Sequence, residues 1–183
     1  MNKKIKWIIA LVLAIVLMIS AYFLYDFLIK DYKPEDNDSS SASDVVLYDA
    51  PDFVVYDVNG NEANLSDYFG KPIVLNFWTT WCHYCTEQMV YFNEVAVSDK
   101  DVTFLMINVT DGVQETVEKA SSYIEENGYE FTVLYDTKYK ASTTYNASSL
   151  PLTYFINKDG KLVTYARGSI SKELLLKGIE MIK

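Results

Sequence analysis

Two cysteines and one histidine lie within four consecutive residues, Cys82-His83-Tyr84-Cys85, and the chain has no other residue of either type. An apolar run typical of a buried strand precedes them, and a helical pattern follows. The first turn of a helix offers unpaired amide N–H groups and the positive end of the helix dipole, so we expect a lowered pKa for the Cys82 thiol. Cys85, one helical turn later, can reach Cys82. The spacing predicts a pair that cycles between dithiol and disulfide.

Three other uses of the pair fit less well. A structural disulfide over so short a loop would stabilise the fold little. A structural zinc site needs four Cys or His ligands, and the chain has three such residues. Covalent haem attachment needs C-x-x-C-H, but Thr86 follows Cys85. We therefore expect a redox dithiol, with no metal and no cofactor besides the Cys82–Cys85 pair.

The elements expected around this pair alternate between strand and helix. The run at 73–78 is almost entirely apolar, which is typical of a strand buried on both faces. Asn59-Gly60 and Asp159-Gly160 mark turns, and a capped single turn is expected at 64–70. Expected strands cover residues 53–56, 73–78, 102–109, 131–134, 149–156 and 162–165; expected helices cover 86–97, 111–127, 138–145 and 171–182. This order predicts an α/β fold, a mixed sheet with helices on both faces.

The N-terminal part has the pattern of a membrane segment. Lys3, Lys4 and Lys6 precede an uncharged run at 7–25, about the length that crosses ~30 Å of hydrocarbon. A cleaved signal peptide and a retained anchor both fit such a run. Further apolar residues follow Ser20-Ala21 at once, which favours the anchor. Because the lysines precede the run, we expect a cytoplasmic N-terminus and a domain on the outside of the cell membrane.

These patterns divide the chain into three parts. Residues 1–30 are predicted to be a single-pass signal-anchor, residues 31–49 a flexible acidic and serine-rich linker, and residues 50–183 the folded domain. After residue 30, acidic residues outnumber basic ones by 24 to 12. Such a surface excludes nucleic acid as a plausible partner.

A resemblance to a known family rests on several motifs together. Trp81-Cys82-x-x-Cys85 follows the strand IVLNFW, and Leu150-Pro151-Leu152-Thr153 lies downstream. With APDFVVYDVNG before the cysteines and INKDGKLV after the proline, the chain resembles the membrane-anchored TlpA/ResA-type thiol–disulfide oxidoreductases over roughly residues 50–182. The resemblance implies a thioredoxin-like fold with an added N-terminal β-hairpin.

The resemblance also implies roles for individual residues. Cys82 would be the attacking thiol and Cys85 the resolving thiol. Pro151 would be a cis proline facing the cysteines, and the backbone at Leu150 would pair with an extended substrate segment. Tyr84 would help tune the pair. Two tryptophans, Trp78 and Trp81, would flank the site as an apolar platform; core packing is the alternative for both.

The chain departs from the family pattern at three places. The dipeptide between the cysteines is His83-Tyr84 where the family's usual dipeptide ends in proline. A protonated His83 can stabilise the thiolate and make the pair a stronger oxidant, or it can be an exposed imidazole with little effect. Asn76 and Gln88 stand where thioredoxins and some ResA-type reductases carry carboxylates. We therefore expect that no buried carboxylate serves Cys85, and that water, His83 or Glu87 moves its proton.

The expected function is reduction of protein disulfides outside the cell membrane, for cytochrome c maturation or related thiol homeostasis. Partners would be protein disulfides or thiols and, by family resemblance, a membrane electron donor. A disulfide-forming oxidase or isomerase is the alternative within the same chemistry. A thiol peroxidase fits less well, because Leu75 stands where its motif needs proline and Arg167 is expected far from the thiols. A redox-silent binding module would have little reason to keep both cysteines.

Overall fold

The computed structural model describes residues 7, 15–20, 22–25 and 47–183. The chain divides into two compact units, Met1–Val45 and Val46–Lys183. In the part of the chain that is described, no helix has both the length and the apolar character needed to cross a membrane. The predicted membrane segment at 7–25 lies partly outside the described residues, and the predicted linker lies outside them up to residue 46.

The second unit is built on one eight-stranded sheet with the strand order β1-β8-β7-β4-β5-β6-β2-β3. The strands are β1 (Tyr48–Asp49), β2 (Val54–Tyr56), β3 (Glu62–Asn64), β4 (Ile73–Trp78), β5 (Thr103–Asn108), β6 (Thr132–Tyr135), β7 (Leu152–Ile156) and β8 (Lys161–Arg167). β4, β5 and β6 run parallel to one another, and the other pairings are antiparallel. The mixed sheet that the sequence predicts is therefore confirmed.

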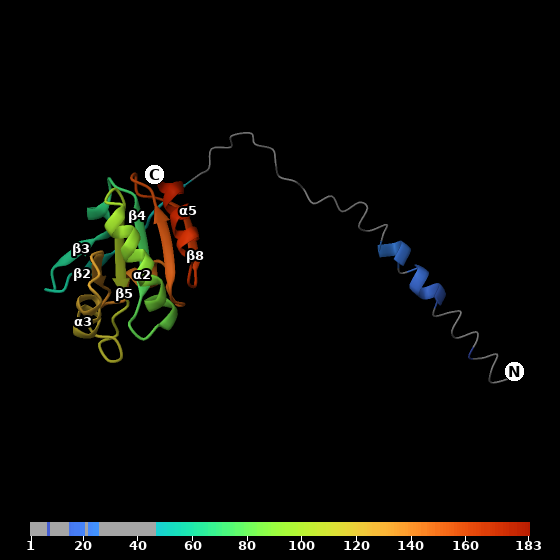
Figure 1. Ribbon diagram of the computed structural model, residues 1–183, viewed down its shortest axis with the longest axis horizontal. Helices are drawn as coiled ribbons and strands as arrows, with labels where there is room; N and C mark the ends of the chain where they lie inside the picture. The colour runs from blue at the N-terminus through green and yellow to red at the C-terminus, as the bar shows by residue number, and fades with distance from the viewer. Residues whose placement is uncertain (1–6, 8–14, 21, 26–46) are drawn as a thin grey trace. The chain divides into compact units, whose positions relative to one another are not determined.

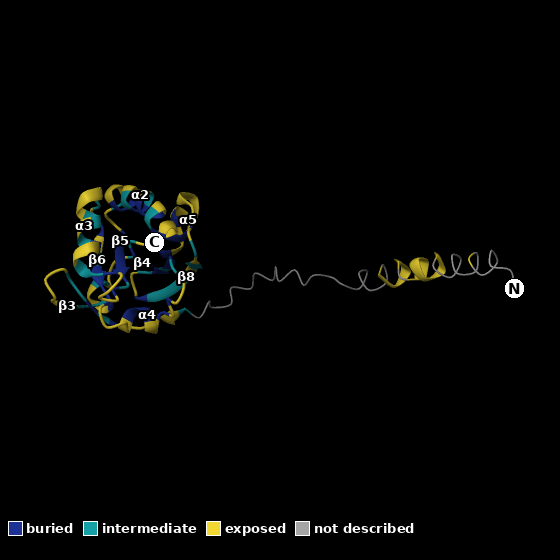
Figure 2. Cartoon of the chain, turned by 90° about the horizontal axis from the view of Figure 1, so that it is seen from below, coloured by how far each residue is buried: buried dark blue, intermediate teal, exposed yellow. Residues whose placement is uncertain are grey.

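Helices cover both faces of this sheet, as Figure 2 shows. The helices are the 3-10 turn η1 (Leu65–Tyr68), α2 (His83–Ser98), α3 (Val117–Asn127), α4 (Lys140–Thr144) and α5 (Lys172–Ile182). α2, α3 and α5 lie on one face and α4 on the other. Because β4 lies inside this sandwich, all six of its residues are buried, which explains the uninterrupted apolar run.

Alternation along β4 divides its side chains between two cores. Val74 and Trp78 pack with residues of α2 and α5, while Leu75 and Phe77 pack with residues of α4 and η1. The polar residue Asn76 shares the face of Val74 and Trp78. Its position below α2 therefore puts an amide in the same layer as the two cysteines.

β4 has the predicted bounds, and α5 begins one residue later than predicted, because Ser171 is its N-cap residue and accepts a hydrogen bond from the Leu174 N–H. Two other helices differ from the prediction in an informative way. α2 starts earlier than predicted, at His83, because Cys82 is its N-cap residue.

The predicted helix at 111–127 is wrong over its first six residues, since α3 begins at Val117. Asp111 Oδ1 accepts hydrogen bonds from three successive amides, at Val113, Gln114 and Glu115, which folds this stretch into a compact loop. Thr116 then caps α3. We call residues 111–116 the 111–116 loop.

Two short antiparallel pairings complete the sheet. β2 and β3 pair around the Asn59-Gly60 turn, where Gly60 has a φ of 83° that other residues rarely adopt. β1 pairs with β8, joining Tyr48 to Leu162. The two residues of β1 belong to the stretch that the sequence analysis assigned to the linker.

Candidate active site

The two cysteines lie between the end of β4 and the first turn of α2, at the edge of the sheet where the parallel strands β4 and β5 end. Figure 1 shows β4 and α2. Cys82 caps α2, and its carbonyl oxygen accepts hydrogen bonds from the Cys85 N–H at 2.9 Å and the Thr86 N–H at 3.1 Å. The two cysteines are joined in a disulfide. Cys82 keeps 8% of its surface exposed, whereas Cys85 has none. A partner can therefore approach Cys82 directly but not Cys85.

Two exposed aromatic residues lie close to Cys82 in the chain. Trp81 is 52% exposed and Tyr84 is 64% exposed, so both offer apolar surface beside Cys82. Trp78, in contrast, is fully buried and packs against the Tyr123 ring with centroids 6.0 Å apart. In the structure Trp78 is a core residue beneath the site, and Trp81 belongs to its rim.

His83 makes its ion-pair contact on the outer face of α2. Its Nε2 lies 3.1 Å from Glu87 Oε1, and the two side chains are 77% and 57% exposed. The His83 ring also lies near the Tyr84 ring, with centroids 5.8 Å apart. A protonated His83 would therefore have a carboxylate as its immediate partner, which offsets its positive charge near Cys82.

The proline loop lies at the same edge of the sheet. Phe77 of β4 is opposite Leu152 of β7, and this antiparallel register places Pro151 beside Trp78. The Leu150–Pro151 peptide bond is cis, as the resemblance implied. Pro151 is buried, and Leu150 is half-buried and precedes the ladder that begins at Leu152. The loop therefore adjoins the strand that leads into the cysteines.

Arg167 lies at the end of β8, in the hairpin region where the sequence predicts it. It pairs with Leu152, which itself faces Phe77, so its backbone lies two strands from β4. Leu152 and Phe77 belong to the core on the α4 side of the sheet, whereas the cysteines belong to the core on the α2 side. The guanidinium carbon of Arg167 lies 5.7 Å from the centroid of the Tyr165 ring.

The two amides that replace family carboxylates are fully buried. Asn76 Nδ2 donates to Thr153 Oγ1 at 2.8 Å, and Gln88 Oε1 accepts from the Ile170 N–H at 3.4 Å. Asn76 Oδ1 and Gln88 Nε2 have no hydrogen-bond partner among the described residues. Gln88 lies three residues after Cys85 on α2. Neither amide can take up a proton from Cys85 as a carboxylate can.

A buried carboxylate does lie beside the site, at a residue that the sequence analysis missed. Glu115, in the 111–116 loop, is fully buried and accepts hydrogen bonds from the Thr80 N–H at 2.8 Å and the Thr80 hydroxyl at 2.6 Å. It also accepts one from Asn108 Nδ2 at 2.6 Å. The turn signal Asp111-Gly112 indicates a loop before Glu115, whereas the amphipathic pattern predicts a helix over 111–127.

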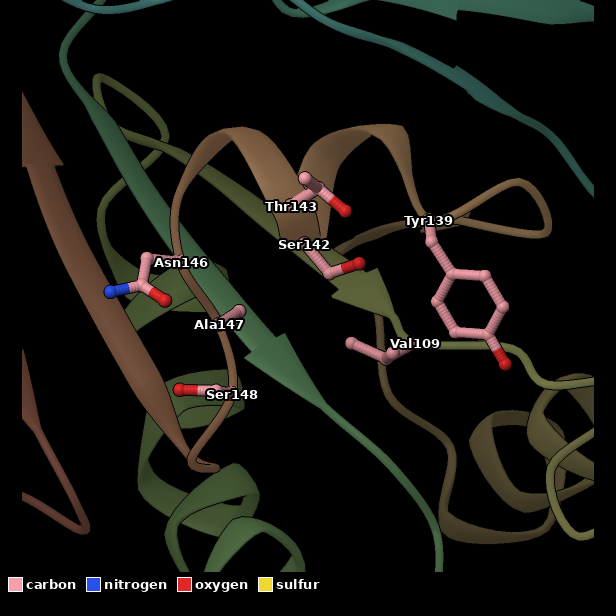
Figure 3. Close-up of a pocket in the computed structure, with 7 residues that line it drawn as sticks. All are labelled: Val109, Tyr139, Ser142, Thr143, Asn146, Ala147 and Ser148. Carbon is pink, nitrogen blue, oxygen red and sulfur yellow. The ribbon is translucent and has the colours of Figure 1, made fainter.

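A cavity of about 390 Å³ opens between the end of β5 and α4 (Figure 3). One lining residue, Val109, contacts the strand that leads into the cysteines, because its N–H donates a hydrogen bond to the Trp78 carbonyl oxygen at 3.0 Å. Tyr139 and Asn146 have φ values of 55° and 51°, unusual for residues other than glycine. The lining offers hydroxyl, amide and methyl groups and no charged side chain: Val109, Tyr139, Ser142, Thr143, Asn146, Ala147 and Ser148.

Comparison with known proteins agrees with this geometry. The model of the AhpC/TSA family matches residues 46–165. The thiol-disulfide oxidoreductase ResA of Geobacillus kaustophilus is 38% identical over 136 residues, which cover 73% of this chain and 76% of that protein.

Two solved structures share the fold. A thiol:disulfide interchange protein DsbE from Chlorobium tepidum has a TM-score of 0.66 and 25% identity, covering 73% of this chain and 94% of that one. The exposed lipoprotein thioredoxin of Streptococcus pneumoniae has a TM-score of 0.61 and 31% identity, covering 71% of this chain and 98% of that one. The chain has a thioredoxin-like fold and belongs to the AhpC/TSA family, as a ResA-type thiol–disulfide oxidoreductase.

Proposed function

We propose that this protein reduces disulfides of other proteins outside the cell membrane, to which residues 7–25 tether it. The observation that carries the proposal is the unequal burial of the two sulfur-bearing residues at the start of α2. Cys82 keeps 8% of its surface exposed, and Cys85 is fully buried. This arrangement suits an attacking thiol that meets the substrate and a resolving thiol that meets only Cys82.

The reaction is two successive thiol–disulfide exchanges. The Cys82 thiolate attacks one sulfur of the substrate disulfide, forms a mixed disulfide and releases the first substrate thiolate, which takes up a proton. Cys85 then loses its proton and attacks the Cys82 sulfur, which releases the second substrate sulfur as a thiol. Two electrons and two protons have passed to the substrate, and the pair is a disulfide. A dithiol donor, which we assign to the membrane, returns the pair to its reduced form.

The surroundings of Cys82 support reduction over oxidation. Strong oxidants stabilise the attacking thiolate with nearby positive charge. Here the His83 imidazole is paired with Glu87, and the carboxylate of Glu115 is hydrogen-bonded to Thr80, two residues before Cys82. Both carboxylates disfavour a thiolate at this place.

The substrate would bind along the proline loop. The Leu150 backbone lies outside the β7 ladder, so we assign it the pairing with an extended segment of the substrate. The exposed rings of Trp81 and Tyr84 would contact apolar side chains beside the substrate cysteine.

The external location rests on the sequence and on one relative. Lys3, Lys4 and Lys6 precede the uncharged run, which favours an external domain. The pneumococcal relative is named an exposed lipoprotein. This chain has no cysteine near the run to which lipid could be attached, so the run itself would be the tether.

The reduction potential of the Cys82–Cys85 pair tests the direction of electron flow. Tryptophan fluorescence of the full chain in detergent, equilibrated against glutathione or dithiothreitol mixtures, reports the fraction oxidised. We expect a potential near or below about −230 mV, in the range of thioredoxin-like reductants. A value near about −120 mV would place the pair among the strong oxidants and turn the proposal to disulfide formation.

Two variants test the roles of the cysteines. Cys85→Ala should accumulate mixed disulfides with substrate proteins, because nothing resolves them. Cys82→Ala is the matched control and should trap none and exchange none. Exchange by Cys82→Ala at the wild-type rate would overturn the assignment.

A further inference from the structure

Glu115 connects two loops at the redox site. Its Oε1 accepts hydrogen bonds from the Thr80 N–H and from Asn108 Nδ2, and its Oε2 accepts one from the Thr80 hydroxyl. Asp111 Oδ1 in turn holds the Glu115 N–H at 2.9 Å. The carboxylate is therefore fixed by its own loop on one side and by the residues before Cys82 on the other.

Both oxygens of the Glu115 side chain accept hydrogen bonds, two at Oε1 and one at Oε2. The Thr80 N–H and Asn108 Nδ2 can only donate, and a carboxylate can only accept. The nearest cation is Lys119, whose Nζ lies 3.9 Å from Oε2 and whose side chain is 49% exposed. Water screens that ammonium more than it screens the fully buried carboxylate. The carboxylate is therefore the less screened of the two charges beside the loop.

The Glu115 carboxylate lies close enough to the Cys82 sulfur for its charge to change the pKa of the Cys82 thiol. Thr80 is two residues before Cys82, and the chain between them is folded into a turn by the bond from the Cys82 N–H to the Thr79 carbonyl oxygen. Chain geometry then puts the carboxylate at most about 14 Å from the Cys82 sulfur. At that distance, with an effective dielectric constant of about 20, one charge shifts a pKa by about one unit.

We propose that the buried Glu115 carboxylate is a positioning residue whose charge shifts the Cys82–Cys85 equilibrium toward the disulfide, and so makes the pair a better electron donor. This inference rests on the proposed function of the same site. The sign follows from the charge: an anion near Cys82 destabilises the thiolate, which is part of the reduced form, and leaves the neutral disulfide unaffected.

Other charges surround the site and act with or against Glu115. His83 and Glu87 on α2 are exposed and paired with each other. Lys119 on α3 opposes Glu115. Asp111 and Arg167 are both exposed, one in the 111–116 loop and the other at the end of β8. Glu115 is the fully buried one among them, so its charge is the least screened.

The test removes the charge and keeps the shape. In Glu115→Gln, the remaining oxygen can accept from the Thr80 N–H and Asn108 Nδ2, and the new amide can donate to the Thr80 hydroxyl oxygen. We expect the Cys82 pKa to fall by up to about one unit, measured by the pH dependence of iodoacetamide alkylation of the reduced full chain. Above that pKa, the dithiol–disulfide equilibrium constant should change by up to tenfold, a potential about 30 mV less negative.

The matched control is a variant that removes one carboxylate charge at a position far from the cysteines. Glu126→Gln removes an exposed carboxylate near the far end of α3 and should leave both the Cys82 pKa and the potential at their wild-type values. If Glu115→Gln behaves like this control, Glu115 is a structural anchor only and the inference is overturned.

A second variant decides the matter if Glu115→Gln does not fold. Lys119→Met removes the half-exposed opposing cation and leaves the bonds from Glu115 to Thr80 in place. It should raise the Cys82 pKa and make the potential more negative, the opposite of Glu115→Gln. Lys158→Met, in the exposed β7–β8 turn, is its control. Equal values for the two lysine variants would also overturn the inference.

The failure of the inference and that of the proposed function are distinguishable. Reduction of insulin disulfides by the wild-type chain with dithiothreitol tests the function. If it is absent while Glu115→Gln still shifts the Cys82 pKa, the function is wrong and the charge effect stands. If wild-type reduction depends on Cys82 but Glu115→Gln shifts nothing, only the inference fails.

Discussion

Replacing Glu115 by alanine should destabilise the folded domain, because it removes the acceptor of a buried network. The Thr80 N–H and Asn108 Nδ2 both lose their partner, and Asn108 is fully buried. A buried donor without a partner costs roughly 1–3 kcal/mol. The Thr80 hydroxyl can turn elsewhere. Removing the carboxylate also relieves part of its own burial cost. We expect a net loss of about 2–4 kcal/mol in the free energy of unfolding.

Urea unfolding of the oxidised proteins measures this loss, with the slope m compared between variants. Thermal unfolding should show a melting temperature lower by roughly 8–15 °C. Glu126→Ala, which removes an exposed carboxylate near the end of α3, is the control and should change the stability by less than about 0.5 kcal/mol.

A double-mutant cycle isolates the buried contact. Asn108→Ala removes one donor, so it should cost less in the Glu115→Ala background than in the wild type, with a coupling of about 1 kcal/mol or more. Additive effects, or a loss from Glu115→Ala below about 1 kcal/mol, would refute the reasoning. In that case water has replaced the carboxylate at little cost.

Two further predictions concern packing and pH. Gly178→Ala should lower the free energy of unfolding, measured in urea, by about 1–2 kcal/mol, because a Cβ there overlaps the Phe155 ring. The cost of this overlap should exceed the gain of about 1 kcal/mol in helix propensity. A more stable variant would show that the ring moves aside freely. Hydrogen bonds from the backbone of Glu115, then of Val113, hold the pKa of Asp111 below its ordinary value of 3.8. The stabilisation by Asp111 is therefore present above about pH 3.8 and is lost as the pH falls through the lower, folded-state pKa. Amide hydrogen exchange in the 111–116 loop should accordingly rise, relative to Asp111→Asn, between pH 4 and pH 2; equal profiles for the two proteins would contradict this.

Local pattern was sufficient for the elements that lead to the cysteines. β4 appears with its predicted bounds because a strand buried on both faces must be apolar at almost every position. The end of α3 at Asn127 was likewise predicted, and the glycine that follows it, Gly128, has the left-handed φ of 64° that favours glycine. The spacing of Cys82 and Cys85 indicated the disulfide by itself, because one helical turn brings the two sulfurs together.

Contacts between distant segments decided the surroundings of the pair. The backbone of Arg167 lies two strands from β4 because the β7–β8 register pairs it with Leu152. Asn76 and Gln88 were recognised as departures, but only packing shows that each leaves a buried polar atom without a partner among the described residues.

Glu115 shows most clearly what the sequence alone determined and what it did not. The sequence determined the redox pair, the strand before it and the helix after it, because these depend on residues that are neighbours in the chain. It could not place a carboxylate 35 residues from Thr80 against the Thr80 amide. That contact exists because β4 and β5 run parallel, so the loops that follow them meet at one edge of the sheet. The redox thiols can therefore be predicted from the sequence, whereas the position of the Glu115 carboxylate near them depends on the tertiary structure.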